Sequence, residues 1–456
     1  MVSIETPPAT DNVLDFVDQA LFLGLRATGQ AAAMQMVWIY DHPVDMDGVR
    51  RFHDNFGYGL AGRLIEPSPL PFGRHRWVAS PGPAAPLLVE SQPRPRAELS
   101  DWLDEHVQLP IDPEFGPGWH MGVLPLTDGS TVLSLVGSHC LGDGGAALLT
   151  VFDAVRGHRR DLGYPTPRSR TRREALLTDA RQTLGDLPQL GRTVVGAVKF
   201  LGRRRREQPA AVKRAPIPLP VGVDLDATVV APAVSAFVGI DEWDARAAAL
   251  GGNSHSLLAG LAGRLAVHQG RELAADGTAG LIVPINDRTL EDDRANAVTL
   301  AHVRVDPTDV TKDLSDTRAA IRAALKVMRE QPDETFELLP LTPFIPKVAV
   351  RQTADLAFGF TEQPVSCSNV GDLPVEVACP DGTQAAHVML RGVDRQITRR
   401  VLEERNGLLT VVSGRIAGQV TITVVGYQPG GENTKAGLRE RLAATLAEFE
   451  LTGVIV

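Results

Sequence analysis

His139-Cys140-Leu141-Gly142-Asp143-Gly144 lies between two apolar runs of different character. The run before it, residues 132–136, is typical of a buried strand. The run after it, residues 145–152, begins like a helix. The sequence therefore predicts a strand, a glycine-rich turn and a helix start, with His139 at the end of the strand.

This junction can support acid–base chemistry. Histidine has an unperturbed pKa of about 6.5, so its imidazole can accept a proton near neutral pH. Glycines let the backbone turn sharply and leave room beside the imidazole. A lone histidine near a strand end is more often structural, but its place in such a turn favours a functional interpretation, with His139 as a candidate general base.

The composition is that of a folded protein with more than one core. The chain has 456 residues, of which 43% are hydrophobic and 22% are charged, so two domains are expected. No apolar run has the length of a membrane-spanning helix, and the N-terminus shows no secretory signal. Three cysteines without metal-ligand spacing favour a reducing, cytoplasmic location and no metal site.

Charge is distributed unevenly along the chain. Residues 156–214 contain 16 Lys and Arg against 5 Asp and Glu, whereas the whole chain has a net charge of −9. A solvated basic helix packed over the body is the simplest interpretation. Peripheral contact with an anionic membrane surface is an alternative. Nucleic acid is not an expected partner, because the segment lacks interleaved aromatic residues and the remaining chain is acidic.

The pattern of the chain predicts mixed α and β structure in three segments. These are an N-terminal lobe (1–155), a basic connector (156–224) and a C-terminal lobe (225–456). Two helical patterns in the connector are separated near Pro188, and a proline-rich loop is expected over residues 66–95. The G-x-G-x-x-G match at residues 57–62 follows a helical pattern rather than a strand, so a dinucleotide site is not expected there.

The sequence resembles the CoA-dependent acyltransferase superfamily marked by H-x-x-x-D-G. That group includes chloramphenicol acetyltransferase, the condensation domains of nonribosomal peptide synthetases and the polyketide-associated acyltransferases. The closest resemblance is to the bacterial wax ester synthase/diacylglycerol acyltransferase branch. Segments similar to that branch follow one another over most of the chain: 14–22, Pro117-Gly118-Trp119, Asn253 with the helix at 257–262, 283–285, Arg288, Asn296 and Ser368-Asn369-Val370.

The resemblance implies an α/β fold with two chloramphenicol-acetyltransferase-like lobes. Each lobe would be a mixed sheet flanked by helices, with an active-site tunnel between the lobes. His139 would be the general base. Asp143, Gly144 and Arg288 would be structural, with Asp143 paired to Arg288. The residues expected to contact substrate are Ser138, Trp119, Asn253, Asn296, Ser368 and Asn369.

The chain also departs from the pattern of that branch. Ser138 stands where the branch has a first histidine, Ser254 replaces the Asp of its N-D pair, and Gly371-Asp372 replaces a Pro-Gly. These departures leave the acceptor open.

The resemblance implies transfer of an acyl group from acyl-CoA, as a substrate, to a hydroxyl or amine acceptor such as a lipid alcohol or diacylglycerol. No cofactor is expected. One alternative is a condensation-type enzyme that joins carrier-tethered substrates, with an acyl carrier protein as partner. The other is a catalytically silent binding or scaffold protein. The expected location is cytoplasmic, with contact at the inner membrane surface through the basic segment.

Overall fold

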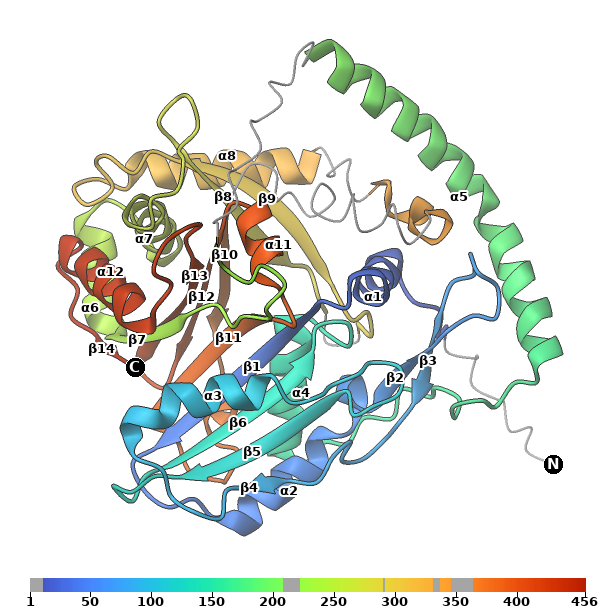
Figure 1. The fold of residues 1–456 in the computed structure, drawn as a ribbon, viewed down its shortest axis with the longest axis horizontal. Helices are drawn as coiled ribbons and strands as arrows, with labels where there is room; N and C mark the ends of the chain where they lie inside the picture. The colour runs from blue at the N-terminus through green and yellow to red at the C-terminus, as the bar shows by residue number, and fades with distance from the viewer. Residues whose placement is uncertain (1–10, 208–221, 290–291, 331–336, 346–363) are drawn as a thin grey trace, which may run out of the picture.

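Two sheets of different size organise the protein. The computed structural model describes residues 11–207, 222–289, 292–330, 337–345 and 364–456. Each sheet is the centre of a lobe and is flanked by helices (Figure 1). The expected two-lobed α/β architecture is confirmed.

The smaller lobe has a five-stranded sheet in the order β11-β1-β6-β5-β4. The strands are β1 (Ala31–Tyr40), β4 (Leu88–Val89), β5 (Trp119–Pro125), β6 (Thr131–Ser138) and β11 (His387–Arg395). Successive side chains alternate between the two faces. Met36, Trp38 and Tyr40 pack with α2 (Met46–Phe56) and α4 (Gly144–Arg156). Val37 and Ile39 pack with α3 (Leu99–Val107) on the opposite face.

Strand β11 joins this sheet from the second half of the chain. It pairs antiparallel with β1 from Ala31↔Arg395 to Ile39↔His387. The Trp38 indole nitrogen also donates to the Val377 carbonyl at 2.7 Å. The N-terminal sheet is therefore completed by residues that lie more than two hundred positions further along the chain, which the sequence pattern did not indicate.

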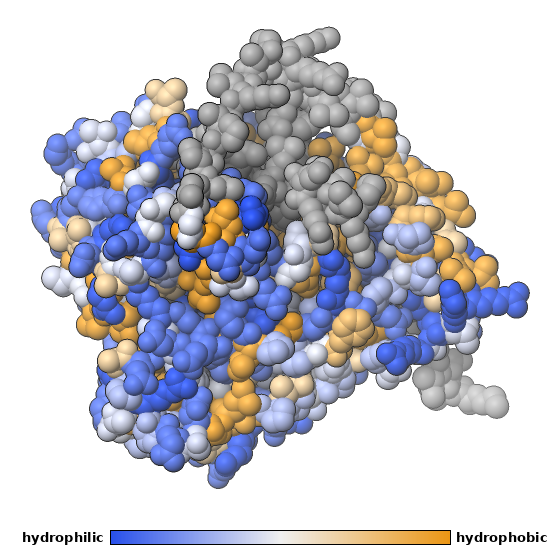
Figure 2. All heavy atoms as spheres, in the orientation of Figure 1, coloured by the Kyte–Doolittle hydropathy of each residue, from blue (hydrophilic) through white to orange (hydrophobic). Residues whose placement is uncertain are grey.

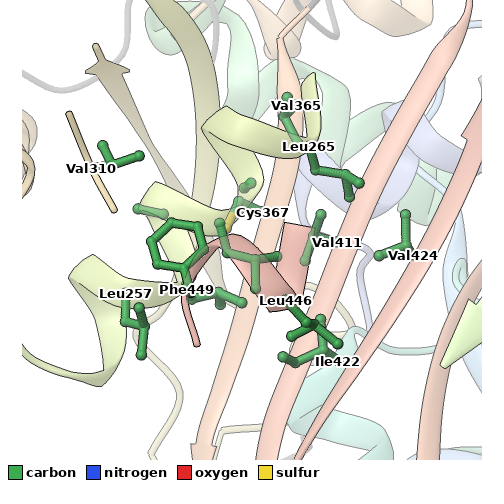
Figure 3. Close-up of a cluster of buried hydrophobic side chains, with 14 of the residues drawn as sticks. Leu257, Leu265, Val310, Val365, Cys367, Val411, Ile422, Val424, Leu446 and Phe449 are labelled. Atoms are coloured by element: carbon green, nitrogen blue, oxygen red, sulfur yellow. The ribbon is translucent and has the colours of Figure 1, made fainter. Parts of the chain in front are cut away.

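The larger lobe has a seven-stranded sheet in the order β14-β7-β13-β12-β10-β8-β9. Its elements are β7 (Ala233–Gly239), α6 (Ile240–Ala249), α7 (Ser254–His268), β8 (Ala279–Asn286), β9 (Val298–Val305), α8 (Ser315–Glu330), β10 (Val365–Asp372), α11 (Arg399–Glu404), β12 (Leu408–Ile416), β13 (Gln419–Tyr427), α12 (Lys435–Glu448) and β14 (Val454–Ile455). Figure 3 shows part of its core, where α7 and α12 pack on the sheet through side chains such as Leu257, Leu265 and Leu446.

Smaller elements complete the fold. They are α1 (Phe16–Thr28), the hairpin of β2 (Arg63–Glu66) and β3 (Arg76–Ala79), and the short 3-10 helices at 59–61, 96–98, 339–344 and 375–378. The expectation of a continuous loop over residues 66–95 was therefore wrong. The 57–62 glycine motif is part of a 3-10 turn, as its context indicated.

The basic segment forms one long helix, α5 (Arg172–Glu207), which continues through Pro188. The expected break at Pro188 was wrong, because the neighbouring Leu184 and Leu187 are exposed and water can solvate the carbonyl that proline leaves unpaired. Orange side chains gather along this helix in Figure 2. Leu190 is buried, whereas Val194 is exposed, and the side chains of Val198, Leu201 and residues 203–206 lie outside the described set. None of the described helices combines the length and apolarity needed to cross a bilayer.

Candidate active site

The backbone around His139 is fixed by its neighbours in the N-terminal lobe. Strand β6 ends at Ser138, and the His139 amide donates to the Ala32 carbonyl at 3.0 Å. The Ser138 carbonyl accepts from the Leu141 amide at 3.0 Å, and its hydroxyl accepts from the Cys140 amide at 3.3 Å. Ser138 therefore shapes the turn. It stands at the position where the resembling branch has a first histidine.

Asp143 connects the two lobes. It is the N-cap of α4, and its Oδ1 accepts from the Ala146 amide at 2.7 Å. Its Oδ2 accepts from the Ala297 amide at 2.7 Å and from Arg288 Nη2 at 3.1 Å. The expected ion pair with Arg288 is present, and both side chains are 4% exposed. Both oxygens of this carboxylate accept hydrogen bonds within the fold, so it holds the turn in place.

Arg288 also holds its own loop in place. Its guanidinium donates to the carbonyls of Arg294, at 2.7 Å, and Ala295, at 2.9 Å. The Ala295 carbonyl in turn accepts from the Asp143 amide at 2.8 Å. The His139 turn and the loop after β8 therefore form one connected unit.

Gly144 and Gly145 face residues of the second lobe. A Cβ at Gly145 would lie 2.8 Å from Asn286 Nδ2, so a larger residue there would have to displace the Asn286 side chain. A Cβ at Gly144 would lie 3.7 Å from Val370, an ordinary contact. Val370 follows Ser368 and Asn369 in β10, so the Ser-Asn-Val segment reaches the start of α4.

Asn296 links the His139 turn to the N-terminal helix α1. Its Nδ2 donates to Asp18 Oδ1 at 2.9 Å and to the His139 carbonyl at 3.4 Å. Asp18 also accepts from the amides of Ala295 and Asn296, at 3.1 and 3.0 Å. Burial raises the pKa of Asp18 to about 6, and the hydrogen bond from Asn296 partly offsets that rise. Asn296 thus supports the turn through its backbone carbonyl.

Arg63 supports the same turn from the β2–β3 hairpin. It is fully buried and donates to the Leu141 carbonyl at 3.1 Å and to the Asp293 carbonyl. Its guanidinium lies over the Trp77 ring, 3.9 Å from the ring centroid. Sequence reasoning did not select Asp18 or Arg63, although Asp18 lies within the N-terminal segment that carried the resemblance.

The hydrogen bonds that hold this turn involve the backbone of His139 and not its imidazole. The residue is partly buried, and its Nδ1 is buried with no hydrogen-bond partner among the described residues. The surrounding carboxylates of Asp18 and Asp143 are already bound elsewhere. An imidazole at the junction of the two lobes, with a ring nitrogen that no described residue occupies, can exchange a proton with a bound molecule.

Other residues expected to contact substrate have structural tasks in this fold. Trp119 is 2% exposed and packs edge-on against Phe56 in the core under α2. Asn253 is the N-cap of α7, with a reciprocal capping box to Ser256. Ser368 pairs with β12 in the sheet, and Asn369 Oδ1 accepts from the Gly371 amide at 2.9 Å. The structure thus brings Ser138, Asp143, Gly144, Arg288 and Asn296 together at His139, whereas Trp119 lies in the core of the smaller lobe and Asn253 is an exposed cap of α7.

The described ranges contain no group of three or more His, Cys, Asp or Glu side chains placed to hold a metal ion. Cys140 and Cys367 are buried free thiols, and burial raises the pKa of each.

Comparison with known proteins gives similarity at the level of the fold. No protein-family model matches the sequence, and no curated protein matches it in sequence. The wax ester synthase/diacylglycerol acyltransferase from Marinobacter aquaeolei VT8 is similar in structure at 16% identity, with a TM-score of 0.55, over 96% of this chain and 98% of that one. Trichothecene 15-O-acetyltransferase from Fusarium sporotrichioides is similar at 11% identity, with a TM-score of 0.58, over 96% and 94%.

A nonribosomal peptide synthetase, FmoA3, is also similar in structure. It matches at 16% identity with a TM-score of 0.53, and 98% of this chain covers 43% of that protein. This chain therefore corresponds to less than half of the synthetase. Together with the two acyltransferases, it shows that this chain has the two-lobed fold of the CoA-dependent acyltransferases and condensation domains.

Proposed function

We propose that this protein transfers an acyl group from acyl-CoA to a hydroxyl or amine acceptor, with His139 as the general base. The observation that carries the proposal is the His139 imidazole, which lies at the lobe junction while the nearby carboxylates of Asp143 and Asp18 are bound to Arg288 and Asn296. The fold, shared with acyltransferases, supports it.

The reaction would proceed in one addition and one elimination. His139 takes the proton of the acceptor hydroxyl or amine as the oxygen or nitrogen attacks the thioester carbonyl. The tetrahedral intermediate then collapses, the carbon–sulfur bond breaks, and the imidazolium returns the proton to the sulfur of the leaving thiol. A lipid alcohol or diacylglycerol is the acceptor class that the sequence resemblance implies.

An acceptor screen with acyl-CoAs of several chain lengths, read by the release of free thiol, tests the proposal. We expect acceptor-dependent thiol release that is lost in His139→Ala and kept in His255→Ala, because His255 is exposed on α7. Absence of thiol release with every donor and acceptor would favour the catalytically silent alternative.

Condensation of carrier-tethered substrates is the second candidate, favoured by the similarity to a nonribosomal peptide synthetase. Offering the same acyl group on CoA and on a carrier protein separates the two. Faster acyl transfer from the carrier at equal concentration would identify the condensation-type activity, and faster transfer from CoA would exclude it.

A further inference from the structure

Strand β11 brings an acidic residue of the second half, Asp394, onto the row of the sheet that contains His139. Asp394 pairs with Ala32 of β1, and the Ala32 carbonyl accepts from the His139 amide at 3.0 Å. Neighbouring strands lie about 4.8 Å apart, so the Cα atoms of Asp394 and His139 are about 10 Å apart, with Ala32 between them.

Both side chains project from the same face of this sheet. Ala33 and Val393, the next residues along their strands, pack with Val107 of α3. Because neighbouring residues of a strand alternate between faces, Ala32 and Asp394 project to the opposite face, as does His139, which continues β6. That face is the one from which α4 begins.

The sheet surface beside these residues has one long side chain, Met34, with a glycine on either side of it. Met34 pairs with Gly137 on one side and with Gly392 on the other, in the next row of the same face. A Cβ added at Gly392 would meet no described atom within 4 Å. Ala32 contributes only a methyl group between the two ionisable residues. In the row itself, the only sheet side chain between the imidazole and the carboxylate is therefore the Ala32 methyl group.

We propose that Asp394 is a positioning residue that acts through His139, stabilising the imidazolium that forms when His139 takes the proton of the acceptor. This inference rests on the proposed function. In this role Asp394 acts as the carboxylate and exchanges no proton: the proton moves from the acceptor to His139 and then to the sulfur of the leaving thiolate, while the carbon–sulfur bond breaks. A negative charge on the same sheet face lowers the energy of the positively charged imidazolium.

The electrostatics agree with this arrangement. Burial raises the pKa of Asp394, and the positive charges of Arg405 and His139 oppose that rise. Several other charged groups surround the turn, and the fold pairs most of them. They are Asp143 with Arg288, Asp18 with Asn296, and Arg63 with the carbonyls of Leu141 and Asp293. Asp394 thus shares a sheet row with His139, and its charge interacts with both Arg405 and His139.

The test follows the titration of His139 directly, by NMR of the ring-labelled protein with His139→Gln for assignment. We expect Asp394→Asn to move the midpoint of the His139 ring signals down by roughly half to one pH unit, and Asp394→Glu to restore it. Arg405→Met should move the midpoint up, because it removes a positive charge. Asp316→Asn, the same charge change on the exposed face of α8, should leave the midpoint in place.

The pH dependence of kcat/KM gives a second readout. In Asp394→Asn the acid limb should shift with the NMR midpoint, and the plateau should fall about three- to tenfold. An unchanged midpoint in both Asp394→Asn and Arg405→Met would overturn the inference. The titration needs no turnover, so an inactive wild type with a coupled midpoint would refute the proposed function and leave the coupling, whereas an active enzyme with an uncoupled midpoint would refute only the role of Asp394.

Discussion

At the scale of the residue, His139 combines a hydrogen-bonded backbone with an imidazole whose Nδ1 has no hydrogen-bond partner in the described part of the chain. Its amide donates to the Ala32 carbonyl and its carbonyl accepts from Asn296, so neither hydrogen bond involves the ring. We therefore expect His139→Ala to lower acyl transfer by about 100- to 10,000-fold, the usual contribution of a general base, with little change in melting temperature. Wild-type turnover in a purified, folded His139→Ala protein would show that the base lies elsewhere.

Asp143 is expected to matter for stability at least as much as for chemistry. Its removal leaves the Arg288 guanidinium buried without a counter-charge and removes the cap of α4. Breaking one side of a buried pair costs about 3–5 kcal/mol, so Asp143→Ala should lower the free energy of unfolding by that order. Denaturant unfolding measures it, with Asp47→Ala as an exposed control that should change stability by less than about 0.5 kcal/mol. An unaltered unfolding midpoint together with lost activity would instead indicate a direct catalytic role.

At the scale of the element, the contact of α3 with its sheet contains a buried histidine pair. His106 and His120 have ring centroids 4.5 Å apart, and His106 Nδ1 is hydrogen-bonded to Ser134 Oγ at 3.0 Å. Burial lowers the pKa of His106 to about 3 and that of His120 to about 4.

This pair makes the lobe sensitive to acid. Between pH 6.5 and about 4 the unfolded chain binds a proton on His120 that the folded state does not, so stability present above pH 6.5 is lost as the pH falls. Between pH 7 and pH 4.5 the free energy of unfolding should fall less in His120→Leu than in the wild type. We expect the two decreases to differ by on the order of 2 kcal/mol. Parallel stability curves for the two proteins, from urea unfolding at each pH, would contradict this.

Helix α5 is the element that could bring the protein to a lipid surface. Its exposed leucines, including Leu177 and Leu184, and its many arginines suit an anionic bilayer, and each basic residue near such a surface contributes about 1 kcal/mol. We expect weak cosedimentation with phosphatidylserine-containing vesicles that high salt abolishes, and that neutralising residues 203–206 removes. The matched control neutralises the exposed basic residues of α8: Arg318, Arg322, Lys326 and Arg329. Equal, negligible binding at low and high salt would leave α5 as a connector.

At the scale of the whole molecule, the lobes depend on each other. Without the second half of the chain, the β1 edge of the smaller sheet would lack β11, and Asp143 and Asp18 would lose their partners in residues 288–297. We expect fragments 1–207 and 222–456, expressed together with one affinity tag, to copurify as a soluble complex. Each fragment expressed alone should aggregate. A soluble, monomeric 1–207 with native-like circular dichroism would show that the smaller lobe does not need β11.

Local pattern was enough to predict part of this protein. The apolar run before His139, the glycines after it and the helix signals that follow are short-range features, so the strand, turn and helix start at residues 131–156 could be predicted directly. The pair of Asp143 with Arg288 was also predicted, because an acid on a tight turn needs a cation and the resemblance supplied one.

Tertiary structure decided the rest, because the deciding contacts join residues that are remote in sequence. The 387–395 segment has no feature that assigns it to the N-terminal sheet, yet its pairing with β1 brings Asp394 to the row of His139. Asp18 and Arg63 support the turn only after α1 and the β2–β3 hairpin have packed over it. Trp119 and Asn253 have residue types that suit a binding site, but burial in a core and a helix cap use the same side chains. Sequence determined the chemistry available at the turn, and long-range packing determined which side chains face it, since burial and pairing are properties of the folded surface rather than of local pattern.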